Sequence, residues 1–177
     1  VSACDINPLA VAATRGNAAK YGFDWSTQIK EGGPGDIGKW MPDQGADVIV
    51  WNLPYIEPES GDCLGPMEES ALIAKDQSTQ LLKAVFSNPD LLNKGGIILL
   101  LHSSNQIGQN IGRDWRQKGW ATRNVSQATV GDERLTVVAC WRPFEGADIT
   151  RLGSCPSTND EVMNLGMVKQ GTFISTE

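Results

Sequence analysis

Two short apolar runs, each followed directly by polar residues, constrain this chain more than any other feature. The first run covers residues 47–51 and leads into Asn52, and the second covers residues 97–102. A helical spacing of apolar residues, from Glu68 to Leu92, separates them. Such runs are typical of parallel strands buried on both faces, and parallel strands need a crossover connection between them. The sequence therefore predicts an α/β fold.

The other elements extend this alternation. Asn7 and Pro8 provide an N-cap and a first helical residue, and the alanine-rich helix that follows should stop at Gly22. Gly131 and Asp132 separate the last two strands, so these should pair as an antiparallel hairpin at the sheet edge. Gly95 and Gly96 should close the helix before the second run. Further strands are expected at 1–5, 27–30, 120–127 and 134–141, and a helix at 106–118.

The composition divides the chain and excludes several classes of protein. The fold should cover residues 1–143, and residues 144–177, rich in Gly, Ser, Thr, Asn and Pro, form an extension outside it. The longest apolar runs fall far short of the roughly 20 residues that cross a bilayer, and no secretory leader opens the chain. With 15 basic against 21 acidic side chains, a net charge of -6 disfavours nucleic acid as a partner.

The thiols and the single imidazole also carry a prediction. Four cysteines stand far apart without a Cys-x-x-Cys pair, and His102 is the only histidine, so no metal site is expected. Cysteines that lie in apolar, strand-like runs are usually free thiols. A reducing, cytoplasmic location follows from this usage.

The segment Asn52-Leu53-Pro54-Tyr55 is the strongest candidate for chemistry. Ligands of open α/β sheets bind beyond the carboxyl ends of the strands, where this turn must lie. The Asn52 side-chain oxygen and the Leu53 carbonyl can accept both N–H bonds of a planar amino or amide group. Pro54 would keep the turn rigid, and Tyr55 would cover the flat face of the substrate. This arrangement suits methyl transfer to nitrogen, although Asn and Pro are also common in plain turns.

Carboxylates at two other strand ends add a nucleotide pocket to this prediction. Asp5 ends the first strand, where a carboxylate can accept both hydroxyls of a ribose, and Ile6 would lie on the adenine face. Asp36, after the next strand, could accept a hydrogen bond from the adenine amino group, while the Ile37 amide donates to the ring. Asn52 would border the same pocket. Together these residues predict a site for S-adenosyl-L-methionine.

Several sequence motifs follow one another along residues 1–143. They are Asp5-Ile6-Asn7-Pro8, Gly35-Asp36, Asn52-Leu53-Pro54-Tyr55, Leu92-Asn93-Lys94-Gly95-Gly96 and Gly131-Asp132-Glu133-Arg134-Leu135-Thr136-Val137-Val138. In this order they resemble the motifs of a class I S-adenosylmethionine-dependent methyltransferase, most closely the HemK-like protein-glutamine methyltransferases. The resemblance covers roughly residues 1–143 and implies a Rossmann-like, mostly parallel sheet with an antiparallel C-terminal hairpin strand. It also implies methylation of a glutamine side chain in a protein such as a translation release factor.

Two departures from the family keep alternatives open. The family usually has Asn-Pro-Pro-Tyr, whereas Leu53 here gives the Asn-Leu-Pro-Tyr that is typical of ribosomal-RNA adenine dimethyltransferases. An adenine amino group therefore stays an alternative substrate. The family's first βα unit, with its glycine-rich loop, has no counterpart in this sequence. The chain is then a fragment, is completed by a partner chain that supplies or covers the missing strand, or is an inactive scaffold in a larger assembly.

Overall fold

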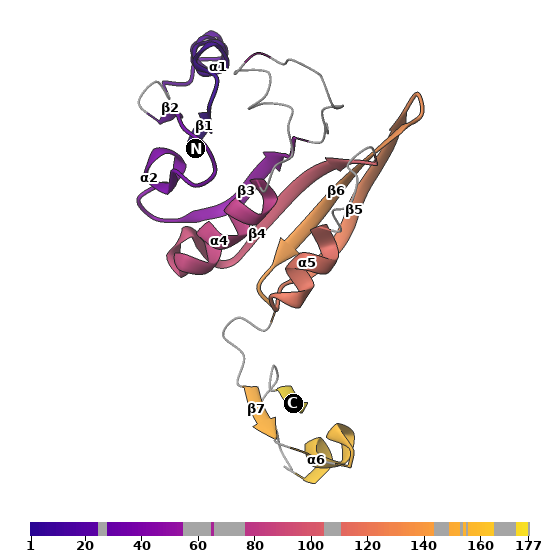
Figure 1. Cartoon of the computed structure of the whole chain (residues 1–177). Helices are drawn as coiled ribbons and strands as arrows, with labels where there is room; N and C mark the ends of the chain where they lie inside the picture. The colour runs from indigo at the N-terminus through magenta and orange to yellow at the C-terminus, as the bar shows by residue number, and fades with distance from the viewer. Residues whose placement is uncertain are drawn as a thin grey trace. The chain divides into compact units, whose positions relative to one another are not determined.

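The computed structural model divides the chain into two compact units, Val1–Trp141 and Arg142–Glu177 (Figure 1). Each is described by itself. The domain assignment made from the sequence, an incomplete methyltransferase-like domain followed by an extension, stays a prediction. The structure describes residues 1–24, 28–54, 65, 77–104, 111–143, 149–152, 154, 156–164 and 173–176.

The first unit opens with a short strand, a helix and a second strand. β1 (Ala3–Asp5) and β2 (Ile29–Glu31) pair in parallel, and α1 (Pro8–Lys20) connects them. The Asn7 side chain caps α1 as expected, because its oxygen accepts a hydrogen bond from the Leu9 amide at 2.9 Å. A short helix, α2 (Ile37–Trp40), follows β2, and the sequence analysis did not predict it.

Four strands of the first unit form a mixed sheet in the order β3-β4-β6-β5. The parallel pair joins β3 to β4, whereas β6 runs antiparallel to both of its neighbours. The predicted hairpin is therefore confirmed, with β5 at the sheet edge. The bounds are β3 Ala46–Asn52, β4 Leu92–Ser103, β5 Ala121–Val130 and β6 Glu133–Trp141.

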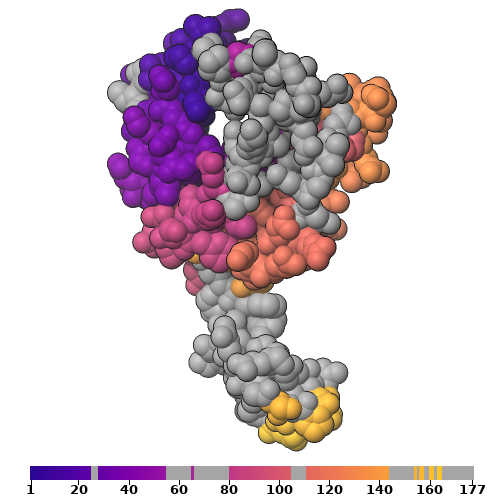
Figure 2. Space-filling view, in the orientation of Figure 1, coloured from indigo at the N-terminus to yellow at the C-terminus, as the bar shows by residue number. Residues whose placement is uncertain are grey.

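Two helices cover one face of this sheet. α4 (Gln77–Ser87), followed by a 3₁₀ turn at Pro89–Leu91, and α5 (Ile111–Gln117) lie on the same side of the strands (Figure 1), and both are visible in the lower part of the first unit in Figure 2. No helix in the described part of the chain is long and apolar enough to cross a membrane. The core joins side chains of the sheet and both helices: Ile49, Leu81, Leu82, Val85, Ile98, Leu100, Ile111, Trp115, Val138 and Cys140.

The continuous apolar run of β3 predicted that the strand is buried on both faces. This prediction is wrong. Ile49 is 9% exposed and lies in the core, but Val48 and Val50 are 52% and 71% exposed. Alternate side chains of a strand point to opposite faces, so the two valines share the face away from Ile49. The pattern of apolar residues is the same for a strand covered on one face or on both, which is why the sequence misled here.

The prediction that Gly95 and Gly96 close a helix before the second apolar run is also wrong. They do not separate a helix from a strand, because β4 already begins at Leu92 and contains both. Gly95 has a φ of 76°, and a Cβ on Gly96 would lie 2.7 Å from the Leu92 side chain. The two glycines belong to an irregularity in the pairing of β3 with β4, which places five residues of β4 opposite two of β3.

The remaining predicted bounds differ in detail. β1 and β2 begin two residues later than expected, and β5 extends to Val130. The described part of the helix predicted at 68–92 is α4 and its 3₁₀ turn, and α5 is the described part of the helix predicted at 106–118. Residues 66–76 and 105–110 lie outside the described ranges.

The second unit contains regular structure that its composition did not predict. β7 (Ile149–Leu152) and β8 (Phe173–Thr176) pair in parallel. Between them, α6 (Thr158–Asn164) follows Ser157, whose hydroxyl accepts a hydrogen bond from the Asp160 amide at 3.3 Å. Loose structure was expected from the high content of small and polar residues, and the extension instead folds back on itself.

Two substitutions, one on β4 and one on β3, test whether the core lies on only one face of the sheet. Leu100 is fully buried in β4, so Leu100→Ala should lower the free energy of unfolding by about 2–5 kcal/mol. Val50→Ala, at an exposed position of β3, should cost less than about 1 kcal/mol. Urea unfolding followed by tryptophan fluorescence measures both, and equal losses would contradict the assigned faces.

Candidate functional site

The predicted catalytic turn begins where β3 leaves the sheet. Asn52, the last residue of β3, is exposed, whereas Leu53 is 1% exposed and Pro54 is buried. The Leu53 amide donates a hydrogen bond to the Leu101 carbonyl on β4 at 2.9 Å. The turn is thus anchored to the neighbouring strand by its backbone and to the core by the Leu53 side chain. Tyr55, the last residue of the motif, lies outside the described residues.

This burial explains how leucine can occupy the second position of the motif. The Leu53 side chain packs in the core cluster that includes Trp40 and Leu81, so the position needs an apolar side chain. Chemistry at this position would use only the backbone carbonyl, which leucine provides as well as proline does. Asn52 adds a side-chain amide that reaches solvent beside that carbonyl. The two groups can act together on one planar donor.

Asp5 lies at the carboxyl end of β1, as the sequence predicted. Its side chain is exposed, and one carboxylate oxygen accepts a hydrogen bond from the Asn7 amide at 2.8 Å. Its backbone carbonyl accepts from the Gly32 amide at 3.0 Å, which ties the end of β1 to the loop after β2. Ile6, the next residue, is 50% exposed, so an apolar surface accompanies the carboxylate.

Asp36 lies in the loop after β2, immediately before α2. One oxygen of its exposed carboxylate accepts a hydrogen bond from the Gly33 amide at 2.9 Å, and its backbone carbonyl accepts from the Lys39 amide at 2.7 Å. Ile37 is the first residue of α2 and is half-buried. The loop that positions Asp36 is therefore closed by its own side chain and by the first turn of the helix.

The two predicted carboxylates act on the same thiol. Burial, and after it the negative charges of Asp5 and Asp36, raise the pKa of Cys4 to about 11. Hydrogen bonds hold the two acids to consecutive residues of one loop: the Gly32 amide donates to the Asp5 carbonyl, and the Gly33 amide donates to the Asp36 carboxylate. The structure therefore places Asp5 and Asp36 near each other.

The groups around Cys4 fit the nucleoside part of S-adenosylmethionine. In the described residues, each carboxylate bonds through one oxygen, which leaves the other as an acceptor for a hydroxyl or an amino group. The exposed Ile6 side chain suits the face of an adenine ring. A ribose and an adenine amino group need hydrogen-bond acceptors, and the adenine ring needs an apolar surface. These residues can provide both.

The residues predicted to bind the nucleoside and the turn after β3 lie beside the same core cluster. Cys4 and Ile37 pack against the core cluster that contains Leu53, and Trp51 packs against it too. Within the described residues, no hydrogen bond joins Asp5 or Asp36 to Asn52. The roles given to these residues therefore stay predictions.

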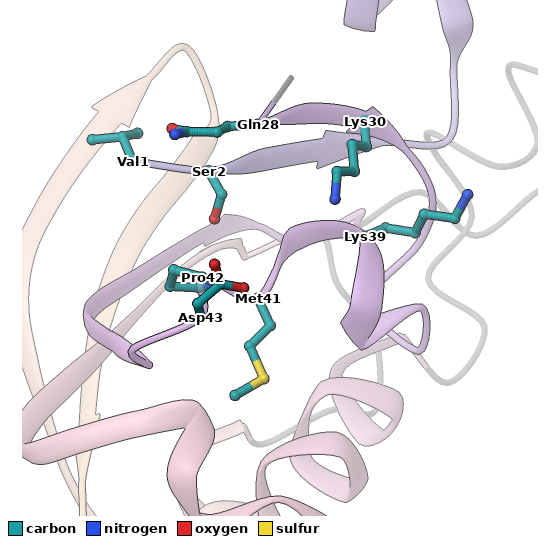
Figure 3. A pocket seen from close by; sticks show the side chains of 8 residues that line it. All are labelled: Val1, Ser2, Gln28, Lys30, Lys39, Met41, Pro42 and Asp43. Atoms are coloured by element: carbon teal, nitrogen blue, oxygen red, sulfur yellow. The ribbon is translucent and has the colours of Figure 1, made fainter. Parts of the chain in front are cut away.

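A cavity of about 210 Å³ lies elsewhere in the first unit. Ser2 and Lys30 extend from the β1–β2 pair toward Pro42 and Asp43, while Lys39 extends away (Figure 3). Ser2 comes just before β1, so the cavity adjoins the start of that strand and not the end that carries Asp5. None of the predicted site residues lines it, and no motif in the sequence indicated it.

The sequence reasoning also missed a polar contact beside the catalytic turn. The Ser103 hydroxyl, at the end of β4, donates a hydrogen bond to the Glu133 carboxylate at the start of β6. Pairing these two residues requires the register of β4 with β6, and no pattern within either strand specifies that register.

Comparison with known proteins supports the resemblance. No protein-family model matches the chain. A "putative protein N5-glutamine methyltransferase" of Methanocaldococcus jannaschii is 24% identical over 139 residues, which cover 78% of this chain and 68% of that protein. The chain is a distant homologue of that protein. The expected resemblance to protein-glutamine methyltransferases is confirmed at this level.

Two solved structures are also similar. A "putative rRNA-methylase" from Clostridium thermocellum has a TM-score of 0.46 and 19% identity, over 78% of this chain and 73% of that one. A "putative methylase" from Haemophilus influenzae has a TM-score of 0.44 and 11% identity, over 77% and 69%. Both scores are below 0.5, so the homology rests on the archaeal sequence.

The environment of Cys4 predicts slow alkylation. Thiolate is the reactive form, and a pKa of about 11 against an ordinary 9.0 lowers its fraction at pH 8 by about 100-fold. Cys4 should therefore react with iodoacetamide about 100-fold more slowly in the folded chain than in urea, and its rate should rise with pH up to about 11. Mass spectrometry of the modified peptides measures this, with Cys140, whose burial raises the pKa to about 12, as the internal comparison. A folded-state rate equal to that in urea would contradict the assignment.

Proposed function

We propose that this chain is an S-adenosylmethionine-dependent N-methyltransferase that acts on a planar nitrogen, the side-chain amide of a protein glutamine. The observation that carries the proposal is the exposed Asn52 at the end of a strand, next to a Leu53 backbone held by Leu101. The distant homology to a protein named for glutamine methylation supports the same chemistry. Translation release factors are the substrate class that the resemblance implies.

In the proposed mechanism, two acceptors orient the nucleophile. The Asn52 side-chain oxygen and the Leu53 carbonyl accept the two N–H bonds of the glutamine amide, which turns the nitrogen lone pair toward the methyl group. The nitrogen would gain positive charge as its bond to the methyl carbon forms and the carbon–sulfur bond breaks. The same two oxygens would stabilise that charge, and the proton would then leave to water. Pro54 keeps the turn rigid, and Tyr55 shelves the flat amide.

The cofactor pocket would form around Asp5 and Asp36. Asp5 would accept hydrogen bonds from the ribose hydroxyls, and Ile6 would lie against the adenine. Asp36 would accept from the adenine amino group, and the Ile37 amide would donate to the ring. Asn52 would border this pocket. S-adenosylmethionine supplies a methyl group bound to a positively charged sulfur, which is a good leaving group.

Leu53 favours a second candidate substrate, the amino group of adenine in RNA or DNA. The two acceptors serve an exocyclic amino group as well as an amide, because both present two N–H bonds in one plane. The net charge of -6 opposes a polynucleotide and favours a protein. We therefore propose glutamine as the first candidate substrate and adenine as the second. We also propose that the enzyme is cytoplasmic.

An additional strand, helix or partner chain beside β3 is also part of the proposal. Val48 and Val50 leave an apolar surface on a strand that, among the described residues, has a pairing partner only on its β4 side. Covering these two valines would remove apolar surface from water. A non-catalytic scaffold would share this surface, so the tests below measure cofactor binding and methyl transfer directly.

Asn52→Ala tests the catalytic turn. The variant should lose at least about 100-fold in methyl transfer to glutamine peptides, because the transition state loses one of its two acceptors. Its affinity for S-adenosylmethionine should stay within about threefold of the wild type. Asn124→Ala, an exposed asparagine on β5, is the matched control and should keep full activity. Unchanged transfer by the Asn52 variant would refute the role of the turn.

Asp5→Asn tests the cofactor pocket separately. Asparagine keeps the oxygen that accepts from Asn7, but it loses the charge that strengthens bonds to ribose hydroxyls. Isothermal titration of S-adenosylmethionine into the 177-residue chain should give micromolar affinity, weakened about tenfold in the variant. Asp132→Asn, an exposed acid on the hairpin turn, should bind like the wild type. Absence of binding by the wild-type chain would favour a scaffold.

A further inference from the structure

The side chains of Asn52, Ser103 and Glu133 point to the same face of the sheet. Asn52 pairs with Leu101, and Ser103 pairs with Leu135. Directly paired residues point to the same face, and so do residues two apart along a strand. Glu133 is two residues before Leu135 on β6, so it shares the face of Ser103, which is two residues after Leu101. This is the face away from α4 and α5.

The Glu133 carboxylate is held in place there. The Ser103 hydroxyl, which is 1% exposed, donates a hydrogen bond to one carboxylate oxygen. The Ser104 amide donates to the Arg134 carbonyl at 2.8 Å, and the Arg134 amide donates to the Ser104 hydroxyl at 2.9 Å. These bonds join the turn end of the β5–β6 hairpin to the end of β4. The carboxylate is therefore a fixed group and not a freely moving one.

One side of this carboxylate is open to a ligand. Glu133 is half-buried, and in the described part of the chain its second oxygen has no hydrogen-bond partner. Asn52 is level with Leu101 on β4 and with Val137 on β6, and Glu133 lies four residues further along β6. Two strand spacings of about 4.8 Å and four residues of about 3.3 Å place Glu133 roughly 16 Å from Asn52. A substrate chain bound at Asn52 can span that distance, since about five extended residues cover it.

The charge at this position selects between classes of substrate. Glu133 places a carboxylate at the start of β6, and Arg134 is next along the strand, on the opposite face from Glu133. A carboxylate repels phosphate, whereas it accepts hydrogen bonds from backbone amides and from lysine or arginine side chains. A fixed carboxylate on the same face as Asn52 thus disfavours RNA and DNA.

We propose that Glu133 is a specificity residue that binds the polypeptide flanking the methylated glutamine, through a basic side chain of the substrate. This inference rests on the proposed function, which it deepens by assigning the substrate to polypeptides with lysine or arginine about five residues from the glutamine. Ser103 is a positioning residue that keeps the carboxylate directed toward that flank. Asn52 and Leu53 bind the amide itself.

The first test measures binding and does not need turnover. Fluorescence anisotropy of the full chain compares two labelled glutamine peptides that differ only by lysine or alanine near the glutamine. The wild type should bind the lysine peptide about tenfold more tightly, and Glu133→Gln should remove that preference while the alanine peptide binds as before. Asp132→Asn, on the same turn, is the matched control and should keep the preference.

A charge exchange separates recognition from a structural role of the Ser103–Glu133 bond. Glu133→Lys should reverse the preference, so that a peptide with glutamate in place of lysine binds better than the lysine peptide. A carboxylate that only holds the hairpin would give weaker binding of every peptide, without reversal. Far-ultraviolet circular dichroism checks that each variant is folded.

The outcomes for this inference and for the proposed function can be told apart. Equal binding of the lysine and alanine peptides by the wild type, or no binding of either, would overturn the role of Glu133. Tighter binding of an adenine oligonucleotide than of the lysine peptide would overturn it as well. The proposed function fails separately, if the lysine peptide binds with the expected preference but is not methylated when S-adenosylmethionine is added.

Discussion

The parallel pairing of β3 with β4 is the constraint on which the rest of the first unit depends. Leu53 donates to Leu101 at the point where the register ends, so the two strands finish at the same edge with polar residues on both. The same pairing aligns Ile49 and Ile98 under α4 and α5. One set of backbone bonds therefore builds the core and gathers the candidate catalytic and recognition groups.

Local signals were sufficient for the parts of the fold in which each element carries its own evidence. Asn7 and Pro8 fixed the start of α1, and Gly131 with Asp132 fixed the hairpin. Coverage of a sheet face is not a local property. Val48 and Ile49 are both aliphatic, yet one is half exposed and the other is in the core, because the helices lie on one side only. No pattern within residues 47–51 encodes that difference.

Some residues of the candidate site could likewise be predicted from the local sequence, and others could not. Asp5, Asp36 and Asn52 could be named from the sequence because each ends a strand or precedes a helix. Hydrogen bonds to the neighbouring residues Gly32 and Gly33 bring Asp5 and Asp36 together. The contact between Ser103 and Glu133 spans 30 residues and depends on the register of an antiparallel pair, which sequence patterning defines only loosely. Contacts of this kind become visible only when the strands are aligned.

The irregularity at Gly95 and Gly96 has a consequence for how this sequence tolerates change. The positive φ of Gly95 interrupts the alternation of side chains, and the pairing with β3 that resumes at Ile97 sets which side chains of β4 meet the helices. A residue lost or gained before Ile97 would therefore alter this irregular segment and leave Ile98 and Leu100 facing the helices. The irregular segment thus allows the length of the chain before Ile97 to vary without exchanging the two faces of β4.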